Sequence, residues 1–167
     1  MIFYKTNNTN IFQFRVAGIS IHNNCLLLHR AVNENFWTLP GGRCELMEES
    51  AVGLKREYAE EIGEDVEVIR PLWLAENFFT YNGETFHELL LTYLVDFKAN
   101  SKCLTLDRFE GAEGHNTLLF EWIPLAQLPN TIIYPEFLKE RLHQLPQSME
   151  LIVQHSEGPR ETNTPNP

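Results

Sequence analysis

The chain has 167 residues, of which 43% are hydrophobic and 22% charged, a balance that excludes a disordered polypeptide and indicates one ordinary domain. Its 13 basic and 23 acidic residues give a net charge of −10, which disfavours a protein that coats long nucleic acid by neutralising phosphates. Half of that charge lies in residues 48–65, which hold seven acids and two bases. A bound metal ion would still let so acidic a chain accept an anionic substrate.

The cysteines and the apolar segments indicate the cellular compartment. Cys25, Cys44 and Cys103 are an odd number without a CxxC pair, which disfavours a disulfide framework or a thiolate zinc site. The first ten residues lack the apolar region of a secretory signal. No apolar stretch reaches the ~18 residues that a membrane-spanning helix needs. We therefore expect a cytoplasmic protein without membrane association.

Strands are predicted along most of the chain, because β-branched and aromatic residues recur between turn signals. The predicted strands are residues 11–21, 25–29, 36–39, 66–69, 72–81, 85–97 and 118–123. The Asn82-Gly83 pair predicts a hairpin between two of them. Residues 149–155 fit either a final strand or a docking segment. Residues 31–35 and 99–116 are predicted as polar loops.

Two helices complete the pattern. The clearest is residues 49–62, in which Ala51, Leu54, Tyr58 and Ile62 form one apolar stripe and Gly63 provides the C-terminal cap. Residues 135–145 predict the second. Strands interleaved with two helices indicate an α/β domain with a mixed sheet between helices.

The domain boundaries follow from composition. We expect residues 1–157 to form a single domain with its core in residues 11–145. Residues 158–167, rich in Pro, Asn and Thr, are expected to be a flexible tail.

Three carboxylates share one face of the first predicted helix. Glu57, Glu60 and Glu61 have the spacing i, i+3 and i+4, and their mean direction lies roughly 110° from the apolar stripe. Clustered carboxylates suit the hard cations Mg²⁺ and Mn²⁺. The alternative is an acidic, solvated helix face with no metal.

The residues around this face carry a known pattern. Residues 42–64 read GRCELMEESAVGLKREYAEEIGE and resemble the Nudix box, G-x5-E-x7-R-E-U-x-E-E-x-G-U, where U is bulky and apolar. All of its fixed positions match, namely Gly42, Glu48, Arg56, Glu57, Glu60, Glu61 and Gly63. Tyr58 departs by its hydroxyl and Glu64 by its charge. The resemblance to the Nudix hydrolase domain covers about residues 12–145, and the Glu76–Phe79, Gly83 and His87-Glu88 pattern looks like a subgroup of small bacterial members.

The resemblance implies a Nudix-type α/β/α sandwich that hydrolyses a phosphoanhydride in a nucleoside diphosphate linked to a further group. It implies Mg²⁺ or Mn²⁺ held by Glu57, Glu60 and Glu61, with Glu48 as a further ligand. Arg56 matches the residue that braces these carboxylates through Glu48. The implied partner is a nucleotide-type small molecule rather than long nucleic acid, and a homodimer is left open.

The general base is a separate question. In the family it is often a glutamate of the box or of a loop before the last strand. Glu113 is our candidate, with Glu110 and Glu61 as competitors; the alternative for Glu113 is an ordinary exposed loop acid.

Further residues are candidates for substrate contacts. Gly41 and Gly42 shape the entry into the helix and, secondly, let phosphate approach. Phe79 is an aromatic candidate for stacking on a base, with Phe78 and Tyr81, against the alternative of core or dimer packing. The remaining candidates, each with a structural or surface alternative, are His87, Arg15 and Arg30.

The sequence therefore predicts a Mg²⁺-dependent hydrolase of nucleoside di- or triphosphates, including oxidised ones. The alternatives are a pyrophosphatase of ADP-ribose or another sugar nucleotide, and a non-catalytic nucleotide-binding module of the same fold. A hydrolase of RNA caps or diadenosine polyphosphates is a further variant, which the acidic balance disfavours.

Overall fold

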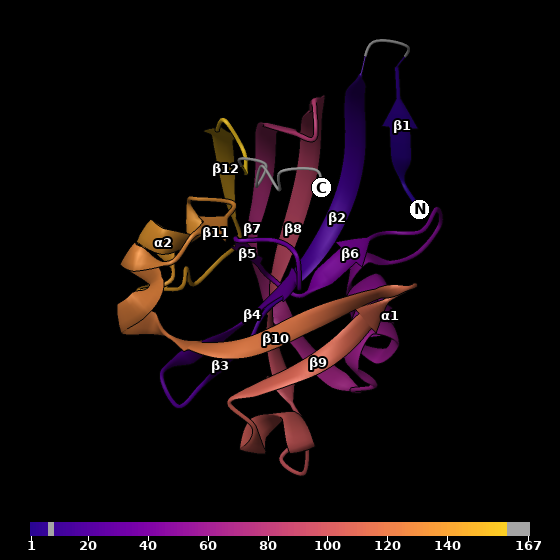
Figure 1. The fold of residues 1–167 in the computed structure, drawn as a ribbon. Coiled ribbons are helices and arrows are strands. Elements are labelled where there is room, and N and C mark those ends of the chain that lie inside the picture. The colour runs from indigo at the N-terminus through magenta and orange to yellow at the C-terminus, as the bar shows by residue number, and fades with distance from the viewer. Residues whose placement is uncertain (7–8, 160–167) are drawn as a thin grey trace, which may run out of the picture.

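The computed structural model describes residues 1–6 and 9–159, and within these ranges the strands form two six-stranded mixed sheets (Figure 1). The first sheet has the order β1-β2-β8-β7-β12, with β6 also paired to β2. Its strands are β1 (Phe3–Lys5), β2 (Asn10–Ile19), β6 (Gly41–Arg43), β7 (Val66–Tyr81), β8 (Glu84–Phe97) and β12 (Glu150–His155). The pairs β2–β8 and β7–β12 are parallel, and the others are antiparallel.

The second sheet has the order β11-β5-β4-β10-β9, with β3 paired to β4. Its strands are β3 (Ile21–His22), β4 (Cys25–Ala31), β5 (Trp37–Thr38), β9 (Arg108–Glu113), β10 (Asn116–Pro124) and β11 (Ile133–Tyr134). Only β11 and β5 are parallel among the pairs of this sheet. The predicted α/β class is confirmed, with its strands divided between two sheets.

Two helices lie on opposite sides of the sheets in Figure 1. Helix α1 (Ser50–Ile62) contacts β2, β6 and β7 of the first sheet and β9 of the second, whereas α2 (Leu138–Arg141) contacts β11. Two 3₁₀ turns, η1 (Lys102–Thr105) and η2 (Leu125–Asn130), complete the described elements. None of the described helices has the length and apolar character that crossing a lipid bilayer requires.

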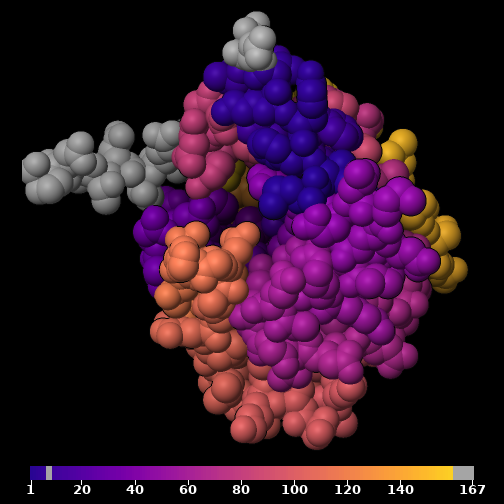
Figure 2. Space-filling model, turned by 90° about the vertical axis from the view of Figure 1, so that its right-hand side faces the viewer, coloured from indigo at the N-terminus to yellow at the C-terminus, as the bar shows by residue number. Residues whose placement is uncertain are grey.

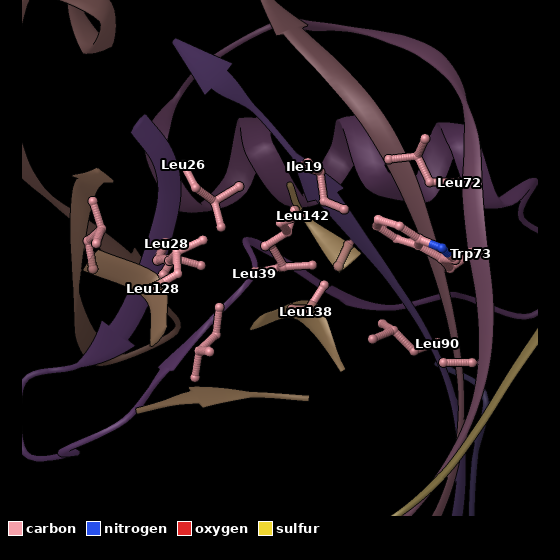
Figure 3. Close-up of a cluster of buried hydrophobic side chains, with 14 residues drawn as sticks. Ile19, Leu26, Leu28, Leu39, Leu72, Trp73, Leu90, Leu128, Leu138 and Leu142 are labelled. Carbon is pink, nitrogen blue, oxygen red and sulfur yellow. The ribbon is translucent and has the colours of Figure 1, made fainter. Parts of the chain in front are cut away.

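The largest apolar core lies between the two sheets and under α2 (Figure 3). Ile19 and Trp73 of the first sheet, Leu28 of the second and Leu138 of α2 are all fully buried in it. Close packing of these side chains fixes the two sheets relative to each other.

Helix α1 is attached through the stripe that the sequence predicts. Leu54 and Tyr58 are fully buried against Val16 and Val95 of the first sheet. The Tyr58 hydroxyl lies 3.3 Å from the Ser20 hydroxyl, so the polar group that departs from the Nudix pattern has a partner. This packing leaves Glu57 against Gly42 of β6 and Glu61 buried beside the sheet.

Two predicted elements have different bounds in the structure. Residues 66–81 form one strand rather than two, because irregularities of register near Val68 and Pro71 place the proline where a missing N–H is tolerated. The predicted helix at 135–145 contains only α2. Beyond it the Gln144 N–H bonds to the Arg141 carbonyl in a tighter turn, ahead of Pro146, which disfavours helical backbone in the residue before it.

Strand β9 lies within the segment predicted as a loop, and β1 was also missed. The sequence of β9, RFEGAE, lacks the β-branched alternation of the other strands. Its Gly111 lies against α1, where an added Cβ would come within 2.5 Å of the Glu61 carbonyl oxygen. Residues 149–155 include strand β12, as one of the two expectations had it. Of the expected tail, the Gly158 carbonyl accepts a hydrogen bond from Tyr134, and residues 160–167 lie outside the described part.

Candidate active site

A cleft of about 610 Å³ lies between the sheets beside helix α1. Side chains of β2, β4, β6, β7 and β8 line it, together with the polar side of α1 and the turn between β9 and β10. Figure 2 shows this side of the molecule, with α1 in magenta and the β9–β10 turn in orange around a hollow. The volume is in the range of sites for small molecules and cofactors.

Two consecutive glycines bring the chain from β6 toward the helix. Gly41 has φ of 142°, and an added Cβ would lie 2.2 Å from the Val16 carbonyl oxygen of β2. At Gly42 an added Cβ would lie 2.3 Å from the carboxyl carbon of Glu57. Gly42 therefore makes room for a carboxylate against the backbone of β6, a more specific role than shaping the loop.

The guanidinium of Arg56 joins the carboxylates of the motif. Its Nε donates to Glu48 Oε1 at 2.8 Å and its Nη2 to Glu48 Oε2 at 3.0 Å. Its Nη1 donates to Glu57 Oε1 at 2.7 Å and to Glu60 Oε2 at 3.1 Å. A fifth hydrogen bond, from Nη2 to the Arg43 carbonyl at 3.2 Å, ties the helix to β6. The structure thus brings together four of the predicted residues.

The charges in this cluster are unequal. Hydrogen bonds from Arg56 lower the pKa of Glu48 to about 2, and the same bonds raise the pKa of Arg56. Burial raises the pKa of Glu57, although the contact with Arg56 acts in the opposite direction. Glu48 is therefore a permanent anion, whereas Glu57 depends on a positive partner.

Glu61 lies deeper than the other acids of the motif. Its side chain is buried with 5% exposed, and its Oε2 has no hydrogen-bond partner among the described residues. Burial first, and then the charges of Glu57 and Glu113, raise its pKa to about 8. His29 Nδ1 is 3.9 Å away, but burial lowers the pKa of His29 to about 3. The imidazole is therefore neutral, and the pair is not a salt bridge.

These residues do not form a complete cation site, but their oxygen atoms are the type of ligand that a hard cation prefers. Within residues 1–6 and 9–159, no three carboxylate, imidazole or thiol side chains converge into a ready-made cation cage. The donors are all oxygens, however, and the unpartnered Glu61 Oε2 lies among them. Mg²⁺ commonly uses one or two carboxylates and completes its shell with water and substrate phosphates. The set suits such a hard cation.

The candidates for the general base differ in position. Glu113 ends strand β9 and lines the cleft, and its charge acts on Glu61 and Arg43. Glu110 does not line the cleft, because residues 110 and 113 lie on opposite faces of β9. Glu61 is enclosed. The structure therefore places Glu113 at the cleft, on a strand rather than on the predicted loop.

The wall of the cleft formed by the first sheet consists of three successive rows of side chains. Pairing of β2, β8 and β7 places Ile11, Phe86 and Phe79 in one row, Gln13, Glu88 and Asn77 in the next, and Arg15, Leu90 and Ala75 in the third. Rows two residues apart along strands are separated by about 7 Å. Arg43 of β6 pairs with Arg15 and extends the third row. Along the wall toward α1, the first row thus contains aromatic side chains, the second polar side chains and the third the two arginines.

The predicted substrate contacts separate into two groups. Phe79 lines the cleft and stacks on Phe86 with ring centroids 4.8 Å apart. Tyr81 also lines it. His87 and Phe78 do not: they stack on each other at 4.4 Å on the opposite face of the same sheet. The structure does not bring His87 to the site, because successive side chains of a strand point to opposite faces.

The two arginines near the first hairpin also differ. Arg15 lines the cleft, and its Nη2 donates to the Gly41 carbonyl at 3.1 Å. Arg30 stacks over the Trp37 ring at the cleft rim. Burial and the nearby Arg15 lower the pKa of Arg43, a residue that sequence reasoning missed. The charge of Arg15 acts on Glu57 and Glu61 of α1, whereas Arg43 interacts with the charges of Glu113 and Glu88.

The residues that sequence reasoning missed are Gln13, Arg43, Asn77 and Glu88. Three of them share one row of the sheet and are at least 95% buried. The signal was present, since polar residues recur every second position within apolar strands and so share a face. These residues can be recognised as neighbours only when the pairing register of β2, β8 and β7 is known, and these strands are not all adjacent in the sequence.

Comparison with known proteins agrees with the motif. A family model described as a NUDIX domain matches residues 12–144. The “Putative mutator protein MutT4” of Mycobacterium tuberculosis is 30% identical over 100 residues, which are 60% of this chain and 37% of that protein. The chain thus spans little more than a third of the length of this relative.

Solved structures share the fold. A mutator MutT protein from Bacillus halodurans has a TM-score of 0.59 at 15% identity, over 87% of this chain and 91% of that one. A NUDIX hydrolase from Nitrosomonas europaea has a TM-score of 0.54 at 22% identity, over 86% of this chain and 79% of that one.

Proposed function

The chain belongs to the NUDIX hydrolase family, and from this we propose that it hydrolyses a phosphoanhydride of a nucleoside di- or triphosphate with the help of Mg²⁺ or Mn²⁺. The observation that carries the proposal is the buried Glu61 oxygen, which has no hydrogen-bond partner among the described residues and is acted on by the charges of Glu57 and Arg15. The carboxylate oxygens of α1 could bind a metal ion and the arginines of the cleft wall could bind phosphate, which together suit a metal-bound polyphosphate.

We assign the metal to Glu57, Glu60 and Glu61, with Glu48 held by Arg56 behind them. A divalent cation there would neutralise phosphate charge and lower the pKa of a bound water. Arg56 orients the carboxylates, since its guanidinium contacts Glu48, Glu57 and Glu60. The contribution of these residues is positioning and electrostatic stabilisation.

We assign the role of general base, which accepts the proton of the attacking water, to Glu113, which lines the cleft. Arg15 and Arg43 lie on the neighbouring wall, where their guanidinium groups donate to phosphate oxygens and hold the chain of phosphates in place. Water would then attack a phosphorus atom and lose its proton to Glu113 while the P–O bond of the phosphoanhydride breaks and the other phosphate group leaves.

The relatives bear on the substrate class. A curated relative is named as a mutator protein, and one structural neighbour is a MutT protein. Those names support a nucleoside triphosphate, including an oxidised one, before a sugar nucleotide such as ADP-ribose. A non-catalytic binding module is disfavoured because every acid of the motif is present.

A panel of purified nucleotides tests the proposal. Normal and oxidised nucleoside triphosphates, diphosphates, ADP-ribose and UDP-sugars would each be incubated with Mg²⁺, with Mn²⁺ and with EDTA, and both products identified by chromatography. We expect metal-dependent release of a nucleotide and phosphate or pyrophosphate. A folded protein that cleaves none of them would contradict the hydrolase assignment, and ADP-ribose as the best substrate would replace the preferred class.

A further inference from the structure

Strand β12 is an outer strand of the first sheet and has one unpaired side (Figure 1). It pairs with β7 in an uninterrupted parallel register, and among the described residues no strand pairs with its other side. The Ser156 N–H, just after the strand, bonds to the Phe78 carbonyl of β7. Because the backbone groups of successive residues point to opposite sides of a strand, those of Leu151 and Val153 face the unpaired side.

The strands at the ends of the two sheets differ in how well they are protected from pairing with another chain. β1 contains Lys5, β9 contains Arg108, Glu110 and Glu113, and β11 has only two residues. Charged side chains and short length are the usual protections of an outer strand. The centre of β12 is apolar, and the strand has no proline and no bulge. β12 is therefore the outer strand best suited to pairing with an added strand.

The side chains of β12 alternate between the core and solvent. Ile152 packs against the large apolar core between the sheets. Leu151 and Val153, on the other face, are 67% and 56% exposed. Exposed apolar side chains that are neighbours on one face, beside an unpaired strand, indicate a surface for another protein chain.

The sequence of β12 is complementary to itself when two copies run antiparallel. In the register centred on Ile152, Leu151 lies opposite Val153 of the second copy, and Glu150 lies opposite Gln154. Apolar side chains then meet apolar ones, and no carboxylate lies opposite another. Centring the pair one residue away in either direction would place a polar side chain opposite Ile152. The pattern thus favours one register and a second copy of the same chain.

We propose that two copies of this chain associate by antiparallel pairing of their β12 strands, centred on Ile152. The outward backbone groups of Leu151 and of Val153 in the second copy exchange two hydrogen bonds, and the two-fold axis repeats this pair. The two first sheets become one continuous sheet. One strand from each copy is a small interface, so the expected dissociation constant is about 10–100 µM.

Sedimentation velocity of the full chain tests the association directly. Concentrations from about 1 µM to about 1 mM bracket the expected constant. We expect the mass to rise from that of one 19.4 kDa chain toward that of two. The mass of one chain at every concentration would overturn the proposal. Growth beyond two copies would also overturn it, because a two-fold interface closes at the dimer.

Val153→Lys places a charge at the proposed interface and should weaken association. Two-fold symmetry applies the change twice, so we expect a dissociation constant about ten-fold higher. Val52→Lys is the matched control, since Val52 lies on α1 and is 54% exposed. Circular dichroism would verify that both variants fold. Equal association of the two variants would overturn the assignment of β12.

A pair of opposite charges tests the register. Leu151→Glu alone should weaken association as Val153→Lys does. Combined in one chain, the two substitutions place a carboxylate opposite an ammonium group of the second copy at two positions, and association should recover. The recovered association should weaken in high salt. A double variant that associates no better than either single variant would overturn the register centred on Ile152.

This proposal and the hydrolase assignment fail separately. The association is measured by mass, so a protein that cleaves no nucleotide can still confirm the dimer. A protein that remains a single chain at all concentrations can still be the proposed hydrolase.

Discussion

The two ends of the cleft are built in opposite ways. At the end formed by α1, carboxylates share one guanidinium, and within the described part of the chain the buried Oε2 of Glu61 has no hydrogen-bond partner. At the other end, stacked aromatic rings and a hydrogen-bonded row of amides surround a single buried carboxylate, Glu88. The first arrangement gathers carboxyl oxygens that could bind a cation, as the proposed chemistry requires. The second holds aromatic and amide groups in fixed positions, as selection among ligands requires.

This comparison predicts different kinetic effects. Changes at the carboxylate end should lower kcat, because they act on charge that develops during the reaction. Changes at the aromatic end should raise KM with kcat nearly constant, because they act on uniform binding. The following substitutions test that division in order of decreasing effect.

The largest effect is expected for Glu57→Gln and Glu61→Gln. Each replaces a carboxyl group of the proposed metal site by an amide that cannot become an anionic ligand, with side-chain shape preserved, and should lower kcat about 100-fold or more. The measurement is the steady-state rate on the best panel substrate at saturating Mg²⁺. Glu49→Gln, on an exposed residue next to α1, is the matched control. Wild-type rates in both site variants would refute the metal assignment.

Gly42→Ala should follow. Its new Cβ would overlap the Glu57 carboxylate, which must move, and a displacement of about 1 Å can cost on the order of 100-fold in rate. Gly83→Ala provides the comparison, since its Cβ meets no atom within 4 Å but its φ is 73°. It should lose about 1 kcal/mol of stability and retain kcat. Equal activity of the two variants would exclude a role for Gly42 in placing Glu57.

Glu88→Gln tests the opposite end. One of the two amides that donate to Glu88 would then face an NH₂ group and must turn, which would disturb the buried polar row of the cleft wall. We expect KM to rise about ten-fold with little change in kcat. Glu76→Gln, on the other face of the sheet near His87, should change neither constant. A large fall in kcat for Glu88→Gln would break the division between the two ends.

The pH dependence of stability gives a smaller effect. The folded protein keeps Glu61 protonated up to about pH 8, whereas the unfolded chain releases that proton near pH 4.5. Because the native state binds more protons in this interval, stability in EDTA should fall as pH rises from about 4.5 to 8. Glu48 has the opposite sign: its pKa of about 2 adds stability that is lost only as pH falls from about 4.5 toward 2.

The measurement is Tm against pH in EDTA for the wild type and Glu61→Gln. The variant should be more stable than the wild type by a few °C at pH 8, and the difference should shrink toward pH 4.5. A constant difference across that range would mean that Glu61 does not carry the raised pKa.

The smallest effect is expected for Tyr81→Phe. The Tyr81 hydroxyl donates to Glu34 Oε1 at 2.7 Å and ties residues 32–35 to the end of β7. Its loss should cost about 1 kcal/mol in urea unfolding, with KM changed less than by Glu88→Gln. Tyr4→Phe, at an exposed side chain, is the control. A loss of stability no greater than that of the control would show that this contact does not hold the loop.

The two ends also differ in how far sequence reasoning reached them. Helical periodicity relates Glu57, Glu60 and Glu61 directly, because neighbours on a helix are three or four positions apart. Gln13 and Glu88 meet across 75 positions, and only the pairing of β2 with β8 places them together. Strand β9 was missed because its composition is that of a loop, although β10 provides its hydrogen bonds.

The hydrogen bonds of Arg56 bear on whether the protein needs a divalent ion to fold. Its guanidinium already donates hydrogen bonds to the carboxylates of Glu48, Glu57 and Glu60 and offsets part of their mutual repulsion, so we expect α1 to fold against the first sheet without a divalent ion. We expect the chain to be made, stored and purified in a metal-free form with its architecture intact. Under the proposed function, the supply of divalent ions would then control turnover without changing the stability of the protein.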